Sequence, residues 1–168
     1  MNAIELLKSQ HQEVNEMFVK LEAADEKAAA TRKMLFGRIA DALAVHGEIE
    51  EKIFYPAVRA KQTEDLLLHS LEEHMEVKKL IANLIDMEPN DAGFDALCNE
   101  LKNHVLHHVG EEENELFPKV EKLFDAAKLD QLGEEMDELA TELKSADAPM
   151  KPREMAAMES KEPMPSLE

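Results

Sequence analysis

Two short segments of the chain repeat one arrangement of residues that can bind metal ions. HGEIEEKIFYP occupies residues 46–56, and HVGEEENELFP occupies residues 108–118. Each segment starts with His, carries Glu-Glu at its fifth and sixth positions, and ends with an aromatic residue followed by Pro. In an α-helix, residues i and i+4 project from the same face, one turn apart. The pattern therefore predicts two side-chain pairs, His46 with Glu50 and His108 with Glu112.

A second repeated feature adds one more His to each half of the chain. HQEVNEMFVKL begins at His11 and HMEVKKLIANL begins at His74, at almost the same offset as the two paired segments. Both His residues lie on otherwise apolar helix faces. A lone His on such a face is ordinarily a core residue, but the repetition selects both together. We therefore expect all of these side chains to face the centre of a helical bundle.

Four His and two Glu inside an apolar bundle need a compensating partner. A buried carboxylate is costly unless it is paired or bound to a metal. Imidazole suits iron, copper, zinc and nickel, whereas carboxylates suit harder ions and can bridge two of them. The mixed set predicts two metal ions that share carboxylates, with iron preferred and manganese as the second choice. The predicted ligands are His11, His46, Glu50, His74, His108 and Glu112.

Apolar residues at three- and four-residue steps predict the helices that must position these side chains. The breaker MEPNDAG separates two of the helices, and Pro56 and Pro118 interrupt the pattern at matching places. We expect an all-α fold, an up-down-up-down antiparallel four-helix bundle with a short fifth C-terminal helix. The expected helices cover residues 3–24, a stretch that ends near Pro56, and residues 64–86, 94–124 and 130–144.

The composition changes at about residue 145. Residues 145–168 contain four Pro and four Met and show no core periodicity. Such a segment cannot bury enough apolar surface to offset the entropy of ordering. We expect residues 1–144 to form one domain and residues 145–168 to form a flexible tail, which could dock a partner protein.

Charge and hydropathy limit the partners and the location of the protein. The formal net charge is −18, which disfavours nucleic acid and anionic membranes because both require Lys and Arg at the interface. No stretch approaches the ~20 apolar residues of a membrane span, and the N-terminus lacks a secretory pattern. Cys98 is the single cysteine and cannot form an internal disulfide. We expect a cytoplasmic protein that is a monomer or a weak homodimer.

The order of His11, His46-x-x-x-Glu50, His74 and His108-x-x-x-Glu112 resembles the hemerythrin-like (HHE cation-binding) domain family over about residues 1–125. The aromatic-Pro endings of the repeated segments fit that family as well. The resemblance implies an up-down four-helix bundle around a non-haem di-iron centre, with two carboxylates and an oxo or hydroxo group as bridges. By that pattern Glu50 and Glu112 are the bridging residues. His11 and His46 would serve mainly one iron, and His74 and His108 the other.

The sequence departs from the oxygen-carrying hemerythrins in its third and fourth helices. Those proteins have His-x-x-x-His on the third helix and His-x-x-x-x-Asp on the fourth, but here Ser70 lies four residues before His74. A site that is one His short has an open metal position, which favours reaction with peroxide or oxygen over reversible carriage. Residues that could fill the gap are His104, Glu51, Glu113 and Tyr55, with packing the favoured role for Tyr55; surface or outer roles are expected for His69 and His107.

Three kinds of function remain open from the sequence. The leading one is a di-iron protein that binds or senses O2, NO or peroxide, or breaks down peroxide, so that its partner is a small diatomic gas or peroxide. The second is a ferritin-like di-iron oxidase or iron-handling protein, although such sites use more Glu than His. The third is a non-enzymatic signalling or interaction module that acts through the tail.

Overall fold

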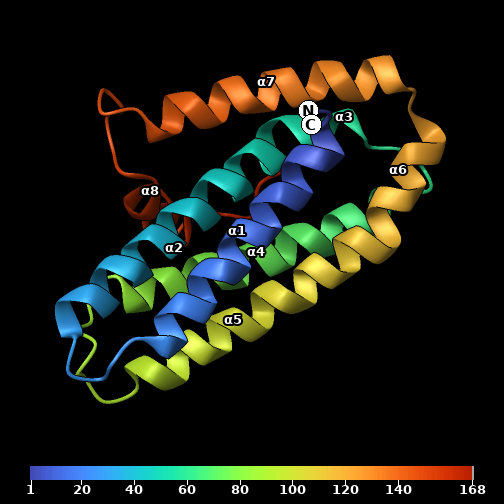
Figure 1. Ribbon diagram of the computed structural model, residues 1–168. Coiled ribbons are helices and arrows are strands. Elements are labelled where there is room, and N and C mark those ends of the chain that lie inside the picture. Colours follow the sequence, from blue (N-terminus) through green and yellow to red (C-terminus); the bar gives the residue numbers. More distant parts are fainter. Residues whose placement is uncertain (168) are drawn as a thin grey trace.

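The computed structural model describes residues 1–167, in which every regular element is a helix. Four long helices form an antiparallel bundle, which confirms the predicted fold. Figure 1 shows the bundle as two hairpins, one from the first two long helices and one from the last two. Within residues 1–167, no helix is both long and apolar enough to span a membrane. The long helices are α1 (Ala3–Ala23), α2 (Ala29–Ile49), α4 (Glu64–Leu84) and α5 (Phe94–Glu111).

In both hairpins the second helix continues through a π-helical turn at the repeated segment. The turn η1 (Glu50–Phe54) follows α2 and leads into α3 (Tyr55–Ala57). The turn η2 (Glu112–Leu116) follows α5 and leads into α6 (Phe117–Leu123). The single helix expected over residues 94–124 is therefore continuous, and consists of α5, the π-helical turn η2 and α6.

Hydrogen bonding explains how both prolines fit into helical structure, which ends at Ala57 just after Pro56 and continues to Leu123 after Pro118. The backbone N–H of Tyr55 donates to the carbonyl of Glu50, and the N–H of Phe117 donates to the carbonyl of Glu112. These bonds span five residues instead of four, so the turn is wider than an α-turn. Pro has no N–H, and its ring crowds the preceding turn. We infer that the wider turn gives Pro56 and Pro118 the room they need.

The helix starts follow signals that are visible in the sequence. Asn2 Oδ1 accepts a hydrogen bond from the Glu5 backbone N at 2.9 Å, and Glu5 Oε2 accepts one from the Asn2 backbone N at 3.2 Å. This reciprocal pair is a capping box, which fixes where α1 begins. Gly93 precedes α5 with φ of 89°, a left-handed conformation that residues with a Cβ seldom adopt. These two signals fix where α1 and α5, the helices of His11 and His108, begin.

The predicted fifth helix is α7 (Ala126–Lys144), which begins four residues earlier than expected. The Asp125 side chain caps it by accepting from the Lys128 backbone N at 2.8 Å. Figure 1 shows α7 lying across the ends of α1 and α2. A Cβ at Gly133 would lie 2.9 Å from the Ala3 backbone N, so this glycine allows α7 to pack directly on the start of α1.

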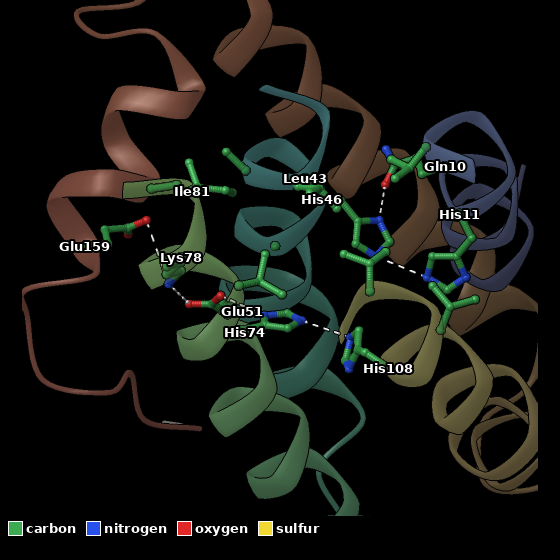
Figure 2. Close-up of a pocket in the computed structure, with 17 residues that line it drawn as sticks. Gln10, His11, Leu43, His46, Glu51, His74, Lys78, Ile81, His108 and Glu159 are labelled. Atoms are coloured by element: carbon green, nitrogen blue, oxygen red, sulfur yellow. Dashed lines mark hydrogen bonds and ion pairs between the residues drawn. The ribbon is translucent and has the colours of Figure 1, made fainter. Parts of the chain in front are cut away.

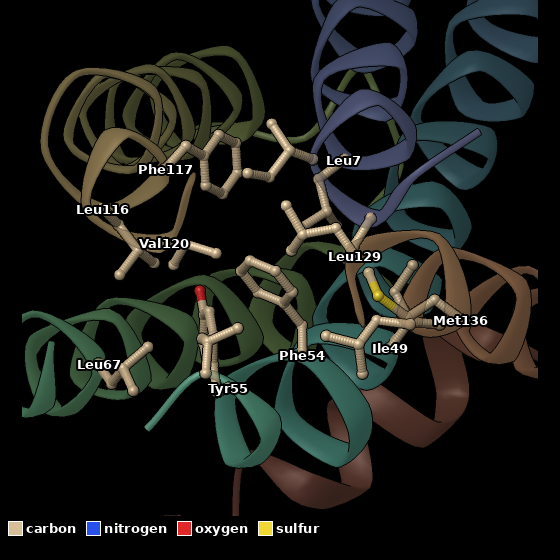
Figure 3. Packing of buried hydrophobic residues seen from close by; sticks show 14 of the residues in the cluster. Leu7, Ile49, Phe54, Tyr55, Leu67, Leu116, Phe117, Val120, Leu129 and Met136 are labelled. Atoms are coloured by element: carbon tan, nitrogen blue, oxygen red, sulfur yellow. The ribbon is translucent and has the colours of Figure 1, made fainter. Parts of the chain in front are cut away.

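The hydrophobic core consists of two clusters, with the predicted metal ligands between them along the bundle. The first cluster joins α7 to the ends of the bundle helices on which it packs, and Figure 3 shows Phe54, Tyr55 and Phe117 packed together in this cluster. The second contains Phe18, Phe36, Ile39, Leu84, Phe94 and Leu101. In α1, for example, His11 comes after Leu7 of the first cluster and before Val14 of the second. The polar site is thus enclosed by apolar packing at both ends.

The C-terminal segment differs from the flexible tail expected from its composition. Residues Pro152–Glu159 form a helix, α8, which packs against α2 and α4. Ala156 is buried in the second core cluster, and Leu167 is buried in the first. Arg153 donates from its backbone N to Asp41 Oδ1 at 3.0 Å and from its Nε at 3.1 Å. A few well-placed contacts with the bundle therefore order a segment that has no apolar periodicity of its own.

Candidate metal centre

Each long helix of the bundle contributes one buried His to a common centre. His11 comes from α1, His46 from α2, His74 from α4 and His108 from α5, and their exposed fractions are only 6–7%. Two of the rings approach with their Nε2 atoms 3.2 Å apart, His11 and His46. The other two, His74 and His108, approach at 3.1 Å. Figure 2 shows these two pairs facing one another.

The two predicted bridging carboxylates lie between the His pairs. Glu50 Oε1 is 3.1 Å from His46 Nε2 and 3.1 Å from His74 Nε2. Glu112 Oε1 is 3.1 Å from His11 Nε2 and 3.4 Å from His108 Nε2. Each carboxylate therefore approaches one His of each hairpin. The structure brings all six predicted residues into one cluster.

The donor atoms divide into two overlapping groups, each of which could hold a metal ion. In each group the candidate ligand atoms lie within 4.8 Å of one another. Glu50 belongs to both groups, which is the position that a bridging carboxylate requires. The groups are His11, His46, Glu50 and Glu112 on one side, and Glu50, His74 and His108 on the other.

The environment of Glu50 fits a metal cation. Its side chain is fully buried, and neither carboxylate oxygen accepts a well-aligned hydrogen bond among residues 1–167, although the imidazole nitrogens of His46 and His74 lie close to Oε1. A buried carboxylate left without such bonds is costly. A cation between Glu50 and the surrounding imidazoles would satisfy both oxygens. The residues present thus match a mixed nitrogen and oxygen site for transition metals.

The outward-facing nitrogen of every cluster His is held by a side-chain oxygen. A carboxylate or amide oxygen that accepts from Nδ1 leaves the Nε2 lone pair pointing into the cluster, as metal-ligating His residues require. The pairs are His11 with Glu113 at 2.7 Å, His46 with Gln10 at 2.7 Å, His74 with Glu51 at 2.8 Å and His108 with Glu73 at 2.9 Å. All four imidazoles are therefore oriented before any metal binds.

Two of these four outer partners are among the candidate residues of the sequence, and two are not. The sequence offers Glu51 and Glu113 as additional ligands because each follows a predicted bridging Glu, and the structure places both against an outward-facing ring nitrogen. Gln10 and Glu73 are not among the residues predicted from the sequence. The available signal was their matching position, since Gln10 directly precedes His11 and Glu73 directly precedes His74.

Tyr55 approaches the cluster more closely than a packing role requires. Its hydroxyl donates to Glu112 Oε2 at 2.6 Å and lies 3.2 Å from His74 Nε2. Burial, together with the charges of Glu112 and Glu50, raises the pKa of Tyr55 well above its ordinary value of 10. Without metal the phenol therefore keeps its proton. Its ring also packs in the first core cluster, as expected, while its hydroxyl is hydrogen-bonded to one of the predicted ligands.

The remaining candidates lie outside the cluster. The His104 side chain is 40% exposed and lies 3.9 Å from Glu100 on its own helix, so it does not replace the His that is absent at position 70. His69 and His107 are at the surface, as expected. Among residues 1–167, no other His occupies the position of the missing His. The hydroxyl of Tyr55 lies on the His74 side of the cluster.

The buried charges strongly perturb the cluster. Burial alone would lower the pKa of His46, but the negative charges of Glu50 and Glu112 outweigh it and raise that pKa to about 9. Burial and Glu112 would raise the pKa of Glu50, but the neighbouring imidazoles lower it to about 2. The pKa values of His74 and His108 are also raised, for the same kind of reason. In the metal-free protein, protons thus occupy sites that metal ions would take.

A small cavity adjoins the cluster on the side covered by α8. Its volume is about 50 Å³, and its apolar walls come mainly from Val14, Leu43, Val77, Ile81, Val105 and Val109. Lys78 and Glu159 line its outer part and lie 3.8 Å apart. Lys78 Nζ also donates to Glu51 Oε1 at 2.8 Å, which connects it to His74 (Figure 2). Burial and the nearby Glu48 raise the pKa of Glu159 to about 8.

Comparison with known proteins gives the same picture of the fold. The family model of the Hemerythrin HHE cation binding domain matches residues 2–120 and, a second time, residues 70–160. A crystal structure of a hemerythrin HHE cation binding domain-containing protein from Mycobacterium kansasii superposes with a TM-score of 0.74 at 24% identity, and covers 95% of this chain and 99% of that one. A curated protein of Nostoc sp. described as a DNA nickase is 27% identical over 153 residues. The chain spans 41% of that protein's length.

Proposed function

Because the chain belongs to the hemerythrin HHE cation-binding domain family, we propose that its buried cluster holds two iron ions and binds or senses O2, NO or peroxide, or breaks down peroxide. Membership of the family carries the coarser statement that the domain binds cations. Iron as the metal, two ions per chain and a small oxidant or gas as the ligand are the parts that we propose.

In this proposal the two hairpins share both metal positions. His11 and His46 hold one iron, and His74 and His108 hold the other. Glu50 and Glu112 bridge the two ions. The short distances between each carboxylate and imidazoles of both hairpins support this assignment.

The observation that carries the proposal is the state of Glu50. It is fully buried and shared between the two groups of candidate ligands, and imidazole nitrogens surround it without giving either oxygen a well-aligned hydrogen bond among residues 1–167. A carboxylate that only stabilised the fold would be expected to accept well-aligned hydrogen bonds. A bridging role gives both of its oxygens a partner.

The size and lining of the cavity support a very small ligand. About 50 Å³ of mainly apolar space admits a diatomic gas or a peroxide, and it excludes an organic substrate of ordinary size. The walls are continuous with the cluster through His11, His46, His74 and His108. A small molecule that entered there would reach the metal positions directly.

Bound iron would supply redox chemistry toward small oxidants. The chain's own residues exclude bulk water from the cluster, because the proposed ligands are all buried. Tyr55 keeps the proton on its hydroxyl and donates a hydrogen bond to Glu112 Oε2, which holds that carboxylate in place in the cluster. Glu51 and Lys78 hold His74 from the cavity side.

Metal analysis of the full chain, loaded with Fe²⁺ without oxygen, tests the proposal. We expect two iron ions per chain in the wild type and a clear loss of iron in His46→Ala. His104→Ala is the matched control, because it removes an exposed His outside the cluster and should leave the iron content unchanged. Less than one iron per chain in the wild type, or equal iron in both variants, would overturn the assignment.

Spectra of the loaded protein then separate the possible roles. Absorption is recorded without oxygen, with O2, with NO and with peroxide. A reversible adduct indicates binding or sensing, whereas repeated loss of added peroxide without damage to the centre indicates an enzyme. If none of these molecules changes the spectrum of the iron-loaded protein, the small-molecule part of the proposal is wrong.

The name of the Nostoc relative does not carry over as a proposal for this chain. The match covers 41% of that protein, so its described activity can reside in the remainder. The net charge of −18 also opposes binding to phosphates.

A further inference from the structure

A second group of metal-binding residues lies on the outside of the helix pair α4 and α5. His69 and Glu73 are one turn apart on α4, and His107 and Glu111 are one turn apart on α5. Each pair repeats the His-x-x-x-Glu spacing of the buried cluster. One ligand atom from each of these four residues lies within 4.8 Å of the others.

The contacts cross between the two helices as well as running along them. His69 Nε2 lies 3.1 Å from Glu111 Oε2 and 3.6 Å from Glu73 Oε2. His107 Nε2 lies 2.8 Å from Glu111 Oε1 and 3.7 Å from Glu73 Oε2. Two nitrogens and the carboxylate oxygens therefore alternate around one point. Ion pairs along a single helix would not require this convergence.

The donor set and its spacing are compatible with a four-coordinate divalent metal. Zinc binds His nitrogen and carboxylate oxygen at about 2.0–2.2 Å, so that neighbouring ligand atoms of a tetrahedron lie about 3.3–3.6 Å apart. The two contacts of Glu73, at 3.6 and 3.7 Å, are close to that range, and the two shorter contacts of Glu111, at 3.1 and 2.8 Å, would have to lengthen as an ion entered. The two His side chains are 48% and 67% exposed, so an ion from solvent reaches them without crossing the core.

We propose that His69, Glu73, His107 and Glu111 form a surface site for a divalent transition-metal cation, with Zn²⁺ as the best geometric match. This site is separate from the buried cluster and does not depend on the function proposed for it. The alternative is a set of solvated ion pairs, which would contribute little and bind no metal.

Glu73 connects the surface site to the buried cluster. Its Oε1 accepts from His108 Nδ1 at 2.9 Å, while its Oε2 faces the two surface His residues. A cation at the surface would draw electron density from this carboxylate and weaken its hold on His108. The oxygen that accepts from a metal-ligating His tunes the basicity of that ligand. This link, unlike the site itself, rests on the proposed function.

Zn²⁺ titration of the full chain by calorimetry, with metal analysis after desalting, tests the proposal. We expect wild-type protein to bind one more Zn²⁺ than the double variant His69→Ala/His107→Ala. His104→Ala, which removes another exposed His of α5, is the control and should bind as the wild type does. The circular dichroism and melting curves of all three establish that the fold is retained.

Repeating the titration in His46→Ala distinguishes this site from the buried one. If the surface residues bind metal, His69→Ala/His107→Ala loses one Zn²⁺ in that background too, whatever happens to the buried iron. Co²⁺ gives a second readout, because a four-coordinate ion at the site produces visible absorption that the double variant lacks. Equal Zn²⁺ binding by the double variant and the wild type, or an equal loss in His104→Ala, would show that the four residues are only ion pairs.

Discussion

The outer partners make the two halves of the buried centre chemically unequal. His11, His74 and His108 each face a carboxylate through Nδ1, whereas His46 faces the neutral amide of Gln10. A carboxylate partner raises the basicity of an imidazole ligand more than an amide does. The side with His74 also has Tyr55 close by. The repeated sequence thus produces two metal positions with different electronic surroundings.

The raised pKa of His46 predicts the pH dependence of the metal-free protein. The pKa is about 9 in the folded chain and 6.5 ordinarily, so the folded state holds the proton more tightly. The resulting stabilisation is complete below pH 6.5 and is lost as the pH rises through 9. We expect the free energy of unfolding to fall by about 1–3 kcal/mol between pH 6.5 and 9. Urea denaturation with a chelator present measures it.

His46→Ala provides the control for this pH effect. The variant lacks the titrating imidazole, so its stability should decline less over the same interval. Glu50 does not confuse the result, since its lowered pKa of about 2 makes its contribution complete above pH 4.5. Stability that rises between pH 6.5 and 9 in the wild type would contradict the predicted sign.

Tyr55→Phe tests the role of the phenol hydroxyl. The variant keeps the ring in the core but removes the donor to Glu112. A hydrogen bond to a charged group contributes about 1.5–3 kcal/mol. We expect the metal-free variant to lose stability in that range while retaining its metal content after loading. Loss of metal from Tyr55→Phe would instead make Tyr55 a ligand, and unchanged stability would argue that the hydrogen bond is unimportant.

At the scale of helices, the π-helical turns account for more of the repeated segments than the ligand pairs alone do, because they involve the aromatic-Pro endings as well. Glu50 and Glu112 each open a widened turn that is closed by the N–H of an aromatic residue. One of these aromatics, Tyr55, returns to the cluster, and the other, Phe117, stacks on His11 with ring centroids 6.0 Å apart. The aromatic-Pro ending therefore belongs to the site, because it shapes the backbone beside both carboxylates.

The helix α8 covers the cavity, which predicts the effect of removing it. Truncation after Lys144 deletes Ala156 and Glu159 from the cavity wall and Leu167 from the core. We expect a chelator to extract metal faster from the truncated protein in a stopped-flow experiment. Burial of Leu167 alone is worth about 1.5–3 kcal/mol, so the melting temperature should fall as well.

Glu159→Gln is the matched variant for this truncation. It leaves α8 in place and removes only a carboxylate whose pKa burial and Glu48 have raised to about 8. We expect slow metal extraction to persist in this variant. Extraction at the wild-type rate from the truncated chain would show that α8 does not limit access.

At the scale of the molecule, the metals are expected to hold the two hairpins together. Each of the two carboxylates proposed as bridges, Glu50 and Glu112, lies close to one His of each hairpin across the bundle axis. A ligand that binds only the folded state stabilises it by about 2.7 kcal/mol at one hundred times its dissociation constant. For a chain of this size, we therefore expect each bound ion to raise the melting temperature of the loaded protein by roughly 5–11 °C over that of the metal-free protein.

Calorimetry with and without a chelator measures this shift. His46→Ala should show a much smaller difference, while His104→Ala should behave as the wild type. Equal melting temperatures for loaded and metal-free wild type would mean that the ions bind folded and unfolded chains alike, or do not bind.

The sequence alone was sufficient to predict the four-helix bundle and the six residues that the structure brings into one cluster. Helical periodicity placed the apolar faces, and the i,i+4 pairs within each repeat required His46 with Glu50 and His108 with Glu112 to point together. Those relations are local along one helix, so no knowledge of neighbouring helices was needed. The position of His11 and His74 followed from the same periodicity.

Only the tertiary structure decided which oxygen faces each ring nitrogen and what covers the site. Gln10, Glu73 and the hydroxyl of Tyr55 reach the cluster across helix interfaces, and no local pattern encodes how neighbouring helices are rotated against one another. The order of α8 also depends on contacts from distant elements, chiefly Asp41 and the surface around Ala156. Composition describes what a segment can do by itself, whereas packing against a finished bundle supplies the free energy that orders it.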